Sequence, residues 1–211
     1  MQMNAMGMEG ETTLCSLDRF ETVAAALPCL QKAKANAMTR EGITTDAPIL
    51  IMGDSHARDM LSALQIGFPT QPFVLLHQSS CPPVAFKVLS KKSCFPDLDQ
   101  QLSTVLDTVN PRLVILASSW PLAGIGAVER TLVPLQAWGG DVLAIGPGPK
   151  FRASTDELLL NLKVDTENLS VDQKIPAEFS FDVYAAQRLL SEIMAEYKMQ
   201  FFDRLSLLCP P

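Results

Sequence analysis

The chain has 211 residues, of which 47% are hydrophobic and 19% charged, so it is long enough for one globular domain with a sizeable core. Its formal net charge is -6 and no cluster of lysine and arginine stands out, which argues against a nucleic-acid role. No apolar stretch is long enough to cross a bilayer, and the N-terminus lacks the basic and apolar regions of a signal peptide.

The first part of the chain, 1–46, is predicted to be a partly helical leader to the sheet. Apolar residues recur at helical spacing from Leu17 to Leu27, which predicts a helix that ends near Pro28. A second helical stretch is predicted over 30–38, followed by a polar connection over 41–46. These residues are expected to be structural.

Strands and helices alternate along the rest of the chain, 47–211. The predicted strands are 49–52, 73–77, 113–117, 142–145 and 199–202. The predicted helices are 56–66, 97–109, 126–138 and 182–197, with a helical patch at 156–162 and an irregular tail from 205. Repeated strand–helix units with aliphatic strands predict an α/β fold, a three-layer α/β/α sandwich with a mostly parallel, flavodoxin-like, five-stranded sheet.

The cysteines give information about the compartment. None of Cys15, Cys29, Cys81, Cys94 and Cys209 forms a C-x-x-C pair. The first two and the next two each bracket a short segment, which predicts two disulfides and an oxidising compartment. The alternative is that all are buried free thiols. Cys209 has no evident partner, which suggests that its partner lies further on. The absence of a signal peptide alone favours the cytoplasm, so the sequence gives two conflicting indications of localisation.

The residues around Ser55 carry the main functional hypothesis. A buried strand over 49–52 ends at Gly-Asp-Ser-His, and a helix follows at once, so Ser55 is expected at the carboxyl end of a central strand, where α/β proteins bind ligands. Free backbone N–H groups of the new helix would suit a developing oxyanion. The structural alternative is that Asp54 or Ser55 simply caps the helix.

Three segments resemble a known family. Residues 49–57, Ile-Leu-Ile-Met-Gly-Asp-Ser-His-Ala, resemble the first block of the SGNH (GDSL-like) hydrolase superfamily. Ser-Cys-Pro-Pro at 80–83 and Leu-Ala-Ser-Ser-Trp at 116–120 are similar to the SGNH domain that is fused to membrane acyltransferases of acyltransferase family three. The resemblance covers roughly 47–211 and implies the three-layer fold that the pattern also predicts.

The resemblance implies roles for individual residues. Ser55 corresponds to the nucleophile, with Asp54 holding the turn and His56 beside it. The oxyanion donors would be the Ser55 N–H, the loop at Ser80 and the indole N–H of Trp120. Trp120 has an equal alternative as a packed aromatic residue.

The sequence departs from the family pattern at its end, where SGNH proteins carry an Asp-x-x-His motif. The chain contains two histidines, His56 and His77, and neither lies in its last quarter. The catalytic Asp and His are therefore expected to be missing, as if the chain were truncated. Adjacent side chains point apart, which argues against His56 as the base for Ser55, and a packing role is the expectation for His77. Asp203 without a histidine beside it carries no catalytic prediction.

The function implied by the resemblance is acyl transfer or ester hydrolysis on cell-envelope polysaccharide, for example of O-acetyl groups, impaired in this chain. The expected partners are an acyl donor or acyl-bearing carbohydrate and a membrane acyltransferase, with the parent protein periplasmic or otherwise outside the cytoplasm. No cofactor or metal site is predicted, because no cluster of ligating residues has metal-binding spacing. The alternative is a non-catalytic SGNH remnant that binds glycan or a partner.

Overall fold

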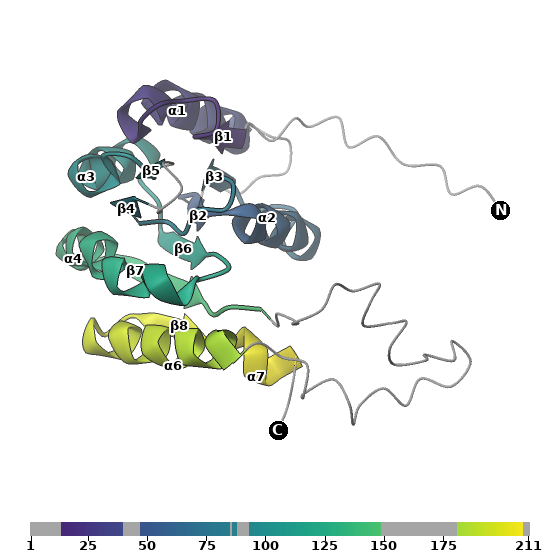
Figure 1. Ribbon diagram of the computed structural model, residues 1–211. Helices are drawn as coiled ribbons and strands as arrows, with labels where there is room; N and C mark the ends of the chain where they lie inside the picture. Colours follow the sequence, from purple (N-terminus) through teal and green to yellow (C-terminus); the bar gives the residue numbers. More distant parts are fainter. Residues whose placement is uncertain (1–13, 40–46, 85, 88–92, 149–180, 209–211) are drawn as a thin grey trace, which may run out of the picture.

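A computed structural model describes residues 14–39, 47–84, 86–87, 93–148 and 181–208 (Figure 1). Its main sheet contains β1 (Leu14–Ser16), β2 (Ile49–Gly53), β3 (Phe73–His77), β6 (Leu113–Ala117), β7 (Asp141–Ile145) and β8 (Gln200–Phe202). The spatial order is β1-β3-β2-β6-β7-β8, and every pairing is parallel. The α/β prediction is confirmed.

The three central strands are almost entirely buried, as their continuous apolar runs predict. In the register of β2, Gly53 lies opposite His77 of β3 on one side and Ala117 of β6 on the other. The carboxyl ends of these strands are therefore level with one another. The loops that leave them meet at one edge of the sheet, where ligands bind in open α/β sheets.

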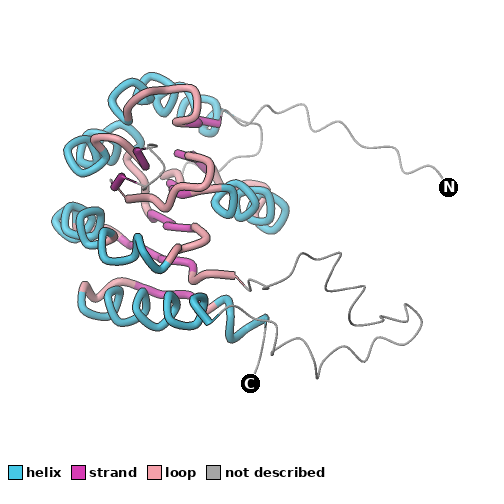
Figure 2. The backbone as a smooth tube through the Cα atoms, viewed as in Figure 1, coloured by secondary structure: helices cyan, strands magenta, loops and turns pink. Residues whose placement is uncertain are grey.

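Helices cover both faces of the sheet, which gives the three layers seen in Figures 1 and 2. The helices are α1 (Val23–Thr39), α2 (Ser55–Gly67), α3 (Leu98–Val109), the 3₁₀ helix η1 (Leu122–Ala127), α4 (Glu129–Trp138), α6 (Phe181–Glu196) and α7 (Arg204–Leu208). One apolar core joins α2 to one face. A larger core joins α1, α3, α4 and α6 to the other face.

The structure corrects the predicted start of the chain. The sheet has six strands rather than five, because residues 14–16 pair with β3. The two predicted helices are one helix, α1, which continues through Pro28. A proline costs a helix one backbone hydrogen bond. Here the buried side chains Val23, Ala26, Leu30 and Ala33 hold the helix on both sides of it.

Further differences concern short elements. The helix predicted over 126–138 is split into η1 and α4, and α4 contains Pro134. The irregular tail begins with a helical turn, α7, whose first turn is capped by Asp203: the carboxylate accepts from Ser206 N at 2.8 Å and from Ser206 Oγ at 2.6 Å. The helical patch predicted at 156–162 and Cys209 lie outside the described residues.

Both predicted disulfides are present, Cys15–Cys29 and Cys81–Cys94. The second closes the loop after β3, which also holds the small hairpin of β4 (Phe86–Lys87) and β5 (Ser93–Cys94). Buried Gln78 fixes this loop, because its amide donates to Ser93 O at 3.0 Å and accepts from Phe95 N at 2.5 Å. The loop is thereby held beside the carboxyl end of β3.

Candidate active site

Ser55 is the first residue of α2 and follows directly on the β2 turn. Its side chain is exposed, and within the described residues its hydroxyl has no hydrogen-bond partner. Asp54 is the N-cap of the helix, and its side chain accepts from the His56 N–H at 2.9 Å. The capping role that the sequence offered as an alternative therefore belongs to Asp54, which leaves the Ser55 hydroxyl accessible.

Gly53 permits this turn. Its φ is +154°, and a Cβ added there would lie 1.7 Å from the carbonyl oxygen of Ala117 and 3.1 Å from the Ala57 Cβ. The backbone of β2 therefore approaches the end of β6 more closely than any side chain allows. This approach brings the turn at Ser55 next to the loop that leaves β6.

Asp54 joins these two loops. Its Oδ2 accepts from Ser118 Oγ at 2.8 Å, from Ser119 N at 2.9 Å and from Ser119 Oγ at 2.9 Å. Its Oδ1 accepts from His56, both from the backbone N–H and from the ring Nδ1 at 3.0 Å. The side chain of Asp54 is 2% exposed, so these donors replace the water shell of its carboxylate.

The hydrogen bonds decide the protonation state of Asp54. Burial raises its pKa, but the hydrogen bonds from His56, Ser119 and Ser118 outweigh that effect and lower the pKa to about 2. Asp54 is therefore ionised at neutral pH and accepts hydrogen bonds only. It fits the predicted role of holding the turn and does not fit that of a proton donor.

The two histidines lie apart from the Ser55 hydroxyl. His56 Nδ1 is bonded to Asp54, which orients the ring along the turn. His77 is buried, and its Nδ1 lies 3.4 Å from Ser16 Oγ on β1, the strand on the far side from β2. In the described part of the chain, neither ring is within hydrogen-bonding distance of Ser55.

The other two predicted oxyanion donors differ in accessibility. Ser80 is exposed in the turn from Gln78 to Cys81, with a φ of 59°, beside the carboxyl end of β3. Trp120 is 2% exposed, and its indole N–H donates to the carbonyl of Ile145 at 2.6 Å. That donor is already used, so the structure gives the indole the packing role that the sequence also allowed.

Sequence reasoning missed three side chains at this edge of the sheet. Ser118 and Ser119 were noted only as part of a family motif, although their place after a buried strand was a signal. Arg204, the first residue of α7, was not singled out. Its guanidinium lies against Gly148, beyond the end of β7, because a Cβ on that glycine would be 2.6 Å from Nη2.

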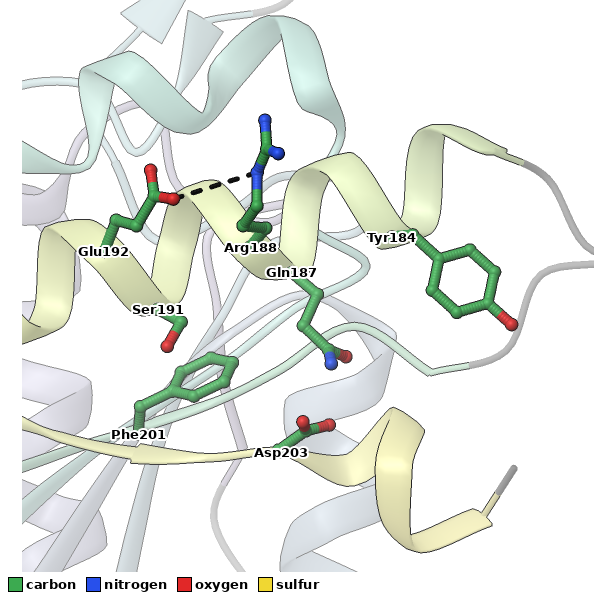
Figure 3. A pocket seen from close by; sticks show the side chains of 7 residues that line it. All are labelled: Tyr184, Gln187, Arg188, Ser191, Glu192, Phe201 and Asp203. Atoms are coloured by element: carbon green, nitrogen blue, oxygen red, sulfur yellow. Dashed lines mark ion pairs between the residues drawn. The ribbon is translucent and has the colours of Figure 1, made fainter. Parts of the chain in front are cut away.

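A separate cavity of about 370 Å³ lies between α6 and β8 (Figure 3). It is lined by Tyr184, Gln187, Arg188, Ser191, Glu192, Phe201 and Asp203. Asp203 is committed to capping α7, and Arg188 Nε lies 3.7 Å from Glu192 Oε1 on the exposed surface of α6. The residues around Ser55 are not among those that line this cavity.

The described residues contain no group of three or more His, Cys, Asp or Glu side chains placed to hold a metal ion. Among the helices of the same residues, none is long and apolar enough to cross a membrane.

A solved structure shares this fold. The periplasmic domain of a lipopolysaccharide acetyltransferase from Salmonella ser. Paratyphi A is 17% identical, with a TM-score of 0.61 over 85% of this chain and 77% of that one. A Bacteroides fragilis NCTC 9343 protein described as an acylhydrolase is 11% identical, with a TM-score of 0.49 over 84% of this chain and 77% of that one. At 17% identity the likeness to the Salmonella domain shows the fold alone.

No curated protein matches the chain. A family does: the one described as the SGNH domain fused to AT3 domains matches residues 26–211. The match includes β2 with Ser55, every strand of the main sheet except β1, and most of α1. The chain therefore belongs to the family of SGNH domains that occur fused to AT3 domains.

Proposed function

We propose that this domain transfers or hydrolyses acyl esters, with Ser55 as the nucleophile. Membership of the SGNH family supports acyl transfer or ester hydrolysis as the general class of activity. The observation that carries the assignment to Ser55 is its position: an exposed hydroxyl on the first residue of α2, on a turn fixed by buried Asp54. A nucleophile needs this combination of access and fixed placement.

In the proposed reaction, Ser55 Oγ attacks the acyl carbonyl carbon and gives up its proton to a base. The oxyanion that forms is stabilised by the backbone N–H groups at Ser55 and in the Ser80 turn. The alcohol leaves with a proton, and the acyl group remains on Ser55. A sugar hydroxyl or water then attacks the acyl-enzyme, and Ser55 recovers its proton.

The proposed reaction needs a base that takes the proton of Ser55. Neither histidine of the described residues reaches Ser55, so we propose that the chain by itself turns over esters slowly. This same observation favours the second candidate function, a non-catalytic domain that binds glycan or a partner. The two candidates differ in whether Ser55 contributes to any ester cleavage.

The proposed substrate is an acyl-bearing carbohydrate of the cell envelope, and the proposed partner is a membrane acyltransferase. The family's fusion to AT3 domains supports the partner, and the Salmonella domain supports the substrate class and an extracytoplasmic location. The two disulfides support the same location, because such bonds persist in oxidising compartments.

The test is p-nitrophenyl acetate hydrolysis by the wild type, Ser55→Ala and Ser62→Ala. Ser62 lies on the same helix, is exposed and bonds only to Arg58 O, so it is a matched control. We expect Ser55→Ala to lower the protein-dependent rate at least tenfold and Ser62→Ala to leave it unchanged. Equal rates for the wild type and Ser55→Ala would reject the catalytic proposal and leave the binding function.

A further inference from the structure

The guanidinium of Arg204 lies at the same edge of the sheet as Ser55 and has no partner among the described residues. Its Nε is buried and forms no hydrogen bond. No ion pair joins Arg204 to a described carboxylate. Buried polar groups are nearly always hydrogen-bonded, so an unused one needs an explanation.

The position of Arg204 follows from the order of the strands. Arg204 follows β8 in the chain, and its guanidinium lies against Gly148. Gly148 lies beyond the end of the neighbouring strand, β7. At about 4.8 Å per strand, β8 is roughly 14 Å from β2. The guanidinium contacts the segment that leaves β7, the strand that lies between β8 and β6 in the sheet.

Two carboxylates of α2 and its N-cap influence the charge of Arg204. Burial lowers the pKa of Arg204, while the carboxylates of Asp54 and Asp59 raise it. The first belongs to the Ser55 turn and the second to the next turn of α2. Both attract the guanidinium, yet neither pairs with it, and part of the arginine surface stays accessible. Arginine keeps its charge in proteins, so the group remains a cation.

We propose that Arg204 binds an anionic group of the substrate, a carboxylate or a phosphate, and so positions the acyl-bearing carbohydrate at Ser55. This inference rests on the proposed function. The planar fork of a guanidinium matches the two oxygens of these groups. Because Arg204 starts three strands away, it suits a charged substituent several bonds from the reacting carbon better than the oxyanion itself.

The nearby carboxylates give the proposal a second signature. Asp54 is fixed by five hydrogen bonds, whereas Asp59 is exposed. A bound anion would be repelled by Asp59, so Asp59→Asn should tighten anion binding. A purely structural arginine would not produce that effect.

The experiment is an NMR titration of the Ser55→Ala protein with D-glucuronate, D-glucose 1-phosphate and neutral D-glucose at matched ionic strength. Working in Ser55→Ala separates binding from ester cleavage, so failure of catalysis leaves this test intact. We expect one of the two anionic sugars to bind at least tenfold more tightly than glucose. The anion that binds more tightly identifies the charged group.

Three further variants, made in the Ser55→Ala protein, test the role of Arg204. Arg204→Gln should remove the preference for the anion, and Arg204→Lys should restore part of it, because lysine keeps the charge without the fork. Arg188→Gln is the matched control, since that arginine is exposed and pairs with Glu192 on α6, and it should change nothing.

Folding is checked by urea unfolding. Arg204→Gln should unfold at the wild-type urea concentration or higher, because Nε gives up no bond. Equal binding of glucuronate, glucose 1-phosphate and glucose by the Ser55→Ala protein would overturn the proposal. An anion preference that survives Arg204→Gln in a folded protein would overturn it equally.

Discussion

At the scale of single residues, Asp54 does most to define the site. Five hydrogen bonds converge on its carboxylate, from His56, Ser118 and Ser119. They connect the β2–α2 turn to the loop after β6, two segments more than 60 residues apart in the chain. The exposed hydroxyl of Ser55, the proposed nucleophile, therefore lies on a turn that buried hydrogen bonds fix in place.

Replacing this carboxylate should make stability depend less on pH. The pKa of Asp54 is about 2 in the folded protein against 3.8 for the free group, so its stabilising effect is complete above about pH 4 and is lost as the pH falls to 2. That difference corresponds to about 2 kcal/mol. In urea unfolding, Asp54→Asn should be less stable than the wild type at pH 7, and the gap should shrink by about 2 kcal/mol by pH 2.

The matched control is Asp107→Asn, because Asp107 is an exposed aspartate on α3 whose side chain forms no hydrogen bond to the described residues. Its stability should follow that of the wild type at every pH. A gap between Asp54→Asn and the wild type that stays constant from pH 7 to pH 2 would contradict the ionised network.

At the scale of elements, the close approach of β2 to β6 requires glycine at position 53. A Cβ there would overlap the Ala117 carbonyl oxygen, which is backbone and has no room to move, and the φ of +154° is strained for other residues. Gly53→Ala should therefore cost about 3 kcal/mol or more in urea unfolding. Gly67→Ala is the control, because nothing lies within 4 Å of the added carbon and the residue ends a helix. It should change stability by less than about 0.5 kcal/mol; equal losses in both variants would reject the steric argument.

The central elements were predictable because their pattern is strong. Short apolar runs over 73–77 and 113–117, each preceded closely by a proline, indicate buried strands, and both were predicted with their observed bounds. The elements that escaped prediction include β1 and α7, which have three and five residues, and the two-residue strands β4 and β5. Such short segments carry too little periodicity, and contacts made after folding decide their form.

Only the part of the candidate site that lies in one local motif could be predicted from the sequence. Ser55 and Asp54 were identifiable because one local motif holds both. The partners of Asp54 and the reach of Arg204 depend on strand order, which places residues distant in the chain side by side. The hydrogen bond from the indole N–H of Trp120 to the carbonyl of Ile145 could not be predicted either, because it depends on the fold.

At the scale of the whole molecule, the loops of the candidate site all leave the carboxyl ends of parallel strands. The geometry of that site therefore depends on how firmly the loops are fixed to the sheet. The two disulfides act at the β1 and β3 side, where Cys15–Cys29 ties β1 to α1 and Cys81–Cys94 closes the loop after β3. Cross-links of this kind stabilise mainly by restricting the unfolded chain. They stabilise the side of the sheet where the outermost strand, β1, has only three residues.

Each disulfide should therefore contribute about 3 kcal/mol, because the closed loops span 14 and 13 positions. Reductant should lower the urea midpoint of the wild type. The double variants Cys15→Ala/Cys29→Ala and Cys81→Ala/Cys94→Ala should each be less stable, and each should lose about half of the wild-type response to reductant. The Cys81–Cys94 variant should also slow p-nitrophenyl acetate cleavage, since Ser80 belongs to that loop, whereas the Cys15–Cys29 variant should not. A wild-type midpoint that does not respond to reductant would show that the cross-links do not stabilise this fold.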